Sequence, residues 1–113
     1  MPVLKTSIGV LFGAAATLGC ASMARAQATD QAAAEQVFDE ANRLADAGRF
    51  EEACPKFAAS HRLDPGYGAV FNLADCHERT GKTASAWAAF REAAAVAQRA
   101  GDEGRVKKAE GRA

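Results

Sequence analysis

The feature that most constrains the fold of this chain is an internal repeat with a period of about 33 residues. Residues 37–63 align with residues 70–96 without a gap. A fixed period of this length is typical of stacked units of two helices, each burying an apolar face against the next. The sequence therefore predicts a repeat architecture, which favours binding over catalysis. The identical pairs are Val37/Val70, Phe38/Phe71, Ala41/Ala74, Gly48/Gly81, Ala53/Ala86 and Phe57/Phe90.

The composition predicts one small, all-α domain. The chain has 113 residues and is rich in alanine, which has the highest helix propensity, whereas strand-forming residues are sparse. The formal net charge is zero, and no basic block is present that could neutralise a row of phosphates. The sequence therefore predicts no nucleic-acid partner.

The first 26 residues have the pattern of an export signal. Lys5 gives a positively charged start, residues 8–18 form an apolar run, and Ala24-Arg25-Ala26 offers the small side chains that signal peptidase accepts. The apolar run is only about half the length that a membrane-spanning helix needs. We therefore expect cleavage between Ala26 and Gln27 and a periplasmic or secreted protein.

Cys20 leaves a second interpretation of this segment open. Leu18-Gly19-Cys20 matches the end of a lipoprotein signal, which is cut before a cysteine that then carries lipid. The protein would then be anchored to a membrane through Cys20. Without that lipid, the sequence predicts no membrane association.

Glycines divide the rest of the chain into helices. Gly48 and Gly81 are predicted to end the first helix of each unit, because glycine adopts the positive φ of a helix C-terminus without steric cost. We expect the first helix to begin at Ala32, and further helices over about residues 51–63, 83–100 and 105–110. The predicted segments are the export signal over 1–26, a polar leader over 27–33, repeat one over 34–66, repeat two over 67–100, and a partial third unit or capping helix over 101–113.

The first helices of the two units differ on the face that points away from their own partner helix. This face is polar in unit one and apolar in unit two, as expected when the first unit caps the stack and the second packs on a neighbour. The polar set is Gln36, Glu40 and Arg43; the apolar set is Ala69, Leu73 and Cys76, and its predicted contacts are Cys54, Ala58 and His61.

Both units resemble the tetratricopeptide repeat. The resemblance covers about residues 34–100. It implies a right-handed stack of helical hairpins whose first helices line a concave groove that binds peptides or partner proteins. The motifs that carry it are Asn72-Leu73-Ala74, Gly48-Arg49-Phe50-Glu51-Glu52-Ala53, Phe57 and Leu63-Asp64-Pro65.

A binding groove is predicted on the exposed side of the first helices. Phe38 and Phe71 would form an apolar floor beneath a mostly acidic rim. We expect a peptide with an apolar anchor between these two rings and some positive charge; the alternative is that both rings belong to the core. The predicted groove residues are Phe38, Asn42, Asp46, Phe71, Asn72, Asp75, Glu78 and Arg79.

Cys54 and Cys76 are predicted to form a disulfide. Both lie on the faces assigned to the contact between the units, and an exported chain enters an oxidising compartment. The bond would close a loop of about 22 residues and stabilise the fold by about 3 kcal/mol. Two buried free thiols are the alternative.

The sequence contains no motif of a catalytic, metal or cofactor site. A glycine-rich phosphate loop, Gly-x-Ser-x-Gly, Cys-x-x-Cys and His-Glu-x-x-His are all missing. Cys54 and His61 would lie about 10 Å apart along one helix, whereas zinc ligands lie about 2 Å from the ion. We therefore expect no metal, no cofactor and no enzyme activity; an enzyme that uses Cys54 or Cys76 is a third interpretation.

Trp87 is predicted at the outer edge of the second unit, beside Arg91 and Ala94. If the tail at Val106 and Ala109 leaves it open, Trp87 offers a surface for self-association or for another chain. A gene model that lost later repeats is the other interpretation of this edge.

The patterns together predict an exported, non-enzymatic protein–protein interaction module, an adaptor or scaffold that binds a peptide or partner protein in its groove. The alternative is a lipid-anchored structural subunit of a cell-envelope assembly, held between larger partners.

Overall fold

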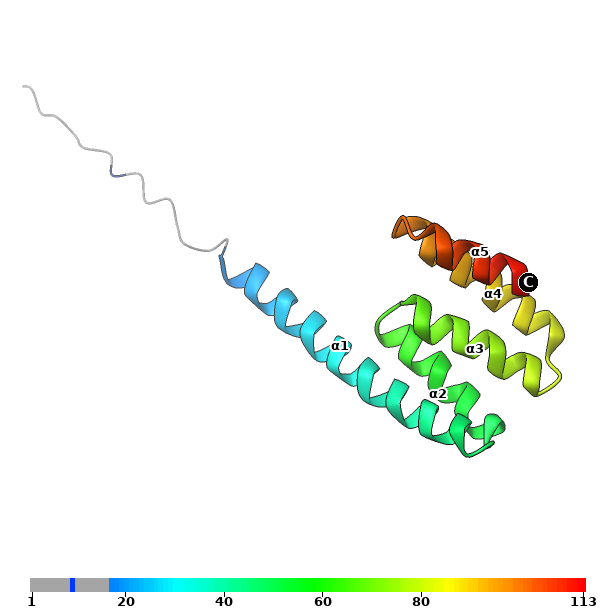
Figure 1. Ribbon diagram of the computed structural model, residues 1–113. Helices are drawn as coiled ribbons and strands as arrows, with labels where there is room; N and C mark the ends of the chain where they lie inside the picture. The colour runs from blue at the N-terminus through cyan, green and yellow to red at the C-terminus, as the bar shows by residue number, and fades with distance from the viewer. Residues whose placement is uncertain (1–8, 10–16) are drawn as a thin grey trace, which may run out of the picture.

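The described part of the chain is all-helical, as predicted (Figure 1). The computed structural model describes residue 9 and residues 17–113. Lys5 and most of the apolar run of the predicted export signal lie outside the described residues. The five helices are α1 (Thr17–Asp46), α2 (Phe50–Leu63), α3 (Tyr67–Arg79), α4 (Thr83–Arg99) and α5 (Glu103–Arg112).

Each helix packs against the helix that follows it in the chain, and successive helices run in opposite directions (Figure 1). The α1–α2 and α3–α4 pairs are the two predicted hairpins, and contacts between α2 and α3 join them. α5 packs on α4 in the same way. Helices that are consecutive in the sequence are therefore also adjacent in space, from α1 to α5.

Small residues let the helices of each hairpin approach closely. Ala41 and Ala74 occupy equivalent positions on α1 and α3, and both are fully buried. Phe57 and Phe90 fill the space beyond them and are only 2% and 1% exposed. These paired positions are the inner faces that the repeat predicted.

Glycines in the left-handed conformation end three of the helices. Gly48, Gly81 and Gly101 have φ values of 75°, 78° and 71°. The residue after each glycine donates its backbone N–H to a carbonyl five residues earlier, as Arg49 does to Leu44 at 2.8 Å. This bond satisfies a carbonyl that the helix end leaves unpaired. Both predicted turns are confirmed, and Gly101 adds a third of the same kind.

The first and last helices are longer than predicted. α1 begins at Thr17 and continues through the predicted polar leader, because residues 20–47 contain neither glycine nor proline and residues 21–34 include seven alanines. Residues 22–32 are exposed, and this half of α1 projects beyond α2 (Figure 1). Ala26 and Gln27 lie inside it. α5 includes Gly104 and Gly111, which were expected outside the helix.

Candidate binding pocket

An open pocket of about 310 Å³ lies between α1, α2 and α3. Each of the three helices contributes side chains to it, so it exists only because the two hairpins lie side by side. Five of the predicted groove residues line it, three from α3 and two from α1. The lining residues are Asn42, Ala45 and Asp46 of α1, Phe50 and Phe57 of α2, and Asn72, Asp75, Cys76 and Arg79 of α3.

Two side-chain amides from different helices line the pocket. Asn42 comes from α1 and Asn72 from α3. Neither amide has a hydrogen-bond partner among the described residues. Each therefore offers both a donor and an acceptor to a ligand. The carboxylate of Asp46 likewise has no ion-pair partner in the described part of the chain.

On the α3 side of the pocket, charged side chains are linked by hydrogen bonds. Nε of Arg79 donates a hydrogen bond of 2.9 Å to Oδ2 of Asp75, and the guanidinium lies 5.0 Å from the centroid of the Phe50 ring. Burial alone would raise the pKa of Asp75, but hydrogen bonds from Arg112 and Arg79 outweigh it and lower the pKa. Asp75 therefore keeps its negative charge at this wall.

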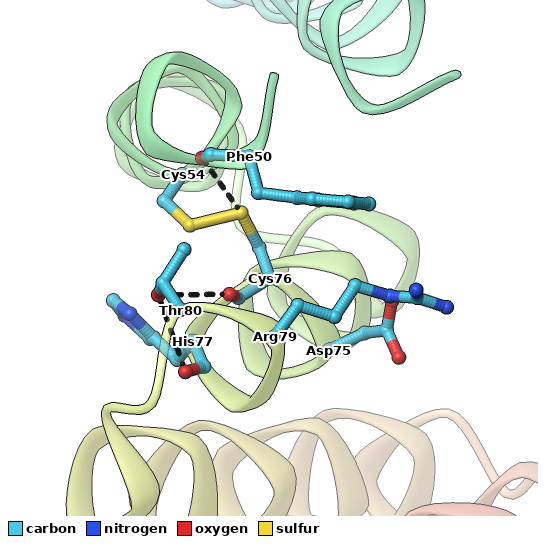
Figure 2. Close-up of a disulfide and its surroundings, with 7 residues drawn as sticks. All are labelled: Phe50, Cys54, Asp75, Cys76, His77, Arg79 and Thr80. Atoms are coloured by element: carbon cyan, nitrogen blue, oxygen red, sulfur yellow. Dashed lines mark hydrogen bonds and ion pairs between the residues drawn. A yellow bond between two sulfur atoms is a disulfide. The ribbon is translucent and has the colours of Figure 1, made fainter. Parts of the chain in front are cut away.

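Cys54 and Cys76 form a disulfide, as predicted (Figure 2), and Cys76 also lines the pocket. Their α-carbons are 5.6 Å apart, and the two side chains are 3% and 1% exposed. The Cys76 sulfur also lies 3.2 Å from the carbonyl oxygen of Phe50. Because a bridged sulfur carries no hydrogen, this is a close contact and not a donated hydrogen bond. The disulfide is consistent with an oxidising compartment.

Three predicted groove residues lie outside the pocket. Phe38 packs edge-on against Phe57, with ring centroids 5.7 Å apart, and lines a separate shallow hollow of about 180 Å³. Phe71 stacks on Tyr67 and lies beneath side chains of α5. Glu78 pairs with Arg112. The two phenylalanines that were expected to hold an apolar anchor are therefore packed against the two cores.

Phe50 and Phe57 form the aromatic part of the pocket, and Phe50 is a lining residue that the sequence analysis missed. It follows the Gly48 turn, which brings the start of α2 back beside the last turn of α1. A sequence signal was available, because Phe50 is a large apolar residue only two positions after the helix-ending Gly48, and it packs on the core cluster that includes Ala41 of α1.

The other candidate sites are resolved by burial and contacts. No group of three or more His, Cys, Asp or Glu side chains in the described part of the chain could hold a metal ion. Cys54 and Cys76 share the disulfide, so neither is a thiol in this structure.

Trp87 is 52% exposed, with the Arg91 guanidinium 5.1 Å from its ring, although Ala109 of α5 is buried. Among the described helices, none is both long and apolar enough to cross a membrane.

Comparison of the chain with known proteins returned no relative. No protein-family model matches it, and neither a curated protein nor a solved structure is similar to it. The assignment of a function rests on the pocket and on the sequence pattern.

Proposed function

We propose that this chain is a non-enzymatic protein–protein interaction module that binds an extended peptide segment of its partner in the pocket between α1 and α3. The observation that carries the proposal is the pair of unpartnered amides, Asn42 and Asn72, in one pocket. A side-chain amide matches the N–H and C=O of an extended backbone, so two amides that line one pocket can both bond to a peptide there.

The proposed architecture is a short stack of tetratricopeptide-type hairpins. Three observations support it: the internal repeat of the sequence, the packing of each helix on the next, and the glycine turns at equivalent positions. In such a stack the first helices of the units, α1 and α3, line the concave side. α5 then corresponds to the first helix of a third unit.

The lining of the pocket indicates the chemistry of the peptide. Phe50 is partly exposed beside the buried Phe57, and these rings favour an apolar side chain. Asp46 has no ion-pair partner among the residues that the structure describes, so it favours a positively charged group at the α1 end. The proposed ligand is a peptide with one apolar anchor next to a basic residue or an amino group.

The proposed setting is the periplasm or the exterior, where the protein acts as an adaptor or scaffold. The export-signal pattern of residues 1–26 and the disulfide between Cys54 and Cys76 support this setting. Lipid on Cys20 would add a membrane anchor without changing the pocket.

A displayed library of random nine-residue peptides tests the proposal. The purified wild-type protein is expected to enrich peptides with a shared pattern, and Asn42→Ala with Asn72→Ala is expected to weaken their binding about tenfold or more, because two hydrogen bonds are lost. Gln36→Ala with Gln98→Ala is the matched control, since it removes two exposed amides outside the pocket. Equal binding by wild type and the asparagine variant, with helicity intact in both, would contradict the proposal.

A further inference from the structure

The second unit repeats a pair of aromatic rings found in the first. Phe71 and Phe90 lie one repeat period after Phe38 and Phe57. Both pairs meet edge to face, with centroids 5.7 Å apart in the first unit and 5.3 Å apart in the second. α3 and α4 therefore form the same edge-to-face ring pair that α1 and α2 form one unit earlier, with Phe71 as its partly exposed member.

The polar residues beside these rings differ between the units. Asp75 and Glu78 on α3 stand where α1 has Asn42 and Ala45 at the equivalent repeat positions. The first unit is thus neutral at these positions, whereas the second carries two carboxylates. A surface of aromatic rings beside carboxylates suits a Lys or Arg side chain.

Side chains of α5 fill this surface. Nη2 of Arg112 donates hydrogen bonds of 2.9 Å to Asp75 and 3.2 Å to Glu78, and its guanidinium lies 4.8 Å from the Phe90 centroid. The Lys108 ammonium lies 4.9 Å from the Phe71 centroid. Two cations of the chain itself therefore occupy the place that a basic ligand side chain would take.

Asp75 connects the open pocket to the filled surface. It lines the pocket, bonding Arg79 through Oδ2, and bonds Arg112 through Oδ1. A peptide bound in the pocket and running along α3 therefore reaches the place of Arg112 next.

We propose that α5 is an internal competitor for this ligand: a Lys or Arg side chain of the bound peptide replaces Arg112 and Lys108 on Asp75, Glu78 and Phe71. The inference rests on the proposed function and extends it, because it assigns the ligand a basic residue beyond its pocket-bound segment.

The two cations of α5 lie on a largely solvent-exposed face of that helix. It has ten residues, and only Ala109 among them is buried. The side chains of Arg112 and Glu78 are 37% and 55% exposed, so water already competes for their ion pair. A ligand that supplies its own cation replaces the ion pairs that Arg112 makes with Asp75 and Glu78.

The same peptide library tests the competition. Lys108→Gln with Arg112→Gln removes both cations and keeps an unbranched polar side chain of similar helix propensity. This variant is expected to enrich Arg and Lys more strongly than wild type does, and to bind the resulting basic peptides about fivefold more tightly, because the competing state is lost. Arg99→Gln with Lys107→Gln is the matched control, since it removes the same charge from exposed positions of α4 and α5.

A third variant keeps the test decisive if α5 unfolds when both cations are replaced. Glu78→Gln, added to the Lys108→Gln and Arg112→Gln changes, is expected to abolish the extra enrichment of basic residues while the pocket pattern persists. Equal affinity of wild type and the double variant for basic peptides would overturn the competition and leave the proposed function standing. A library from which no form of the protein enriches any pattern would overturn both.

Discussion

The hydroxyl of Ser60 donates a hydrogen bond of 2.8 Å to the carbonyl oxygen of Ala34, and so joins α2 to α1 at a buried position. Ser60 is 4% exposed. The equivalent position in the second hairpin is Ala93, which is fully buried and has no hydroxyl. One hairpin is thus held by packing and a hydrogen bond, and the other by packing alone at this point.

Ser60→Ala is expected to lower the free energy of unfolding by about 1 kcal/mol, the usual net value of an intramolecular hydrogen bond. The loss stays modest because alanine already fits at Ala93 in the same environment. Urea denaturation followed by circular dichroism measures it. Ser85→Ala, at an exposed position of α4, is the control and is expected to change stability by less than about 0.5 kcal/mol. Equal effects of the two changes would contradict a stabilising role of the hydrogen bond.

Cys54→Ala with Cys76→Ala is expected to lower the free energy of unfolding by about 3 kcal/mol, because the unfolded chain regains the freedom of a loop of about 22 residues. The same urea experiment measures the loss. Wild-type protein in reductant is the control and should unfold at the same urea concentration as the variant. Detection of two free thiols at these positions in unreduced protein would refute the disulfide.

His77 is expected to make stability depend on pH. Burial, with a smaller contribution from Lys82, lowers its pKa below the ordinary value of 6.5, and its Nδ1 is buried without a hydrogen-bond partner among the described residues. As the pH falls below 6.5, the unfolded chain takes up the proton before the folded one does, so the free energy of unfolding decreases.

His77→Leu tests this dependence, since Leu44 occupies the equivalent position of the first unit. The variant is expected to be about 1 kcal/mol more stable than wild type at pH values near 5.5, because it removes an unpartnered buried nitrogen. The difference should shrink as the pH rises. A difference between the two proteins that does not change with pH would argue against a titrating His77.

Gly48→Ala and Gly111→Ala are expected to act in opposite directions. Gly48 has a φ of 75°, a conformation in which an added Cβ costs about 1–2 kcal/mol although no neighbouring atom lies within 4 Å. Gly111 lies inside α5 with open space around it, so alanine there should gain up to about 1 kcal/mol. Thermal unfolding of both variants measures the signs. A Gly48→Ala variant as stable as wild type would show that the turn can adopt another conformation.

The hairpins and their contact could be predicted from particular residues. Gly48 and Gly81 fix two helix ends because few other residues adopt their backbone conformation at low cost. The disulfide was predictable because Cys54 and Cys76 lie on apolar faces that a second unit must bury. In each case a local rule and the packing of the repeat agree.

The extension of α1 and the contact of α5 with α3 were not predicted. A polar but alanine-rich segment such as residues 21–34 has no apolar stripe, so hydrophobic periodicity does not detect its helix, whereas helix propensity does. The contact of Arg112 with Asp75 joins residues 37 positions apart through a long side chain, which apolar patterns cannot show. The sequence does give one signal for this contact: Arg112 lies one repeat period after Arg79, so the two arginines occupy equivalent positions.

Because Cys76 lines the pocket and is also bonded to Cys54, a covalent link fixes the separation of α2 and α3 where a partner would be received. If a peptide binds there as proposed, the disulfide lowers the entropy that binding costs, because it already restrains this part of the pocket. Reduction of the disulfide is therefore expected to lower the affinity for such a peptide as well as the stability of the fold.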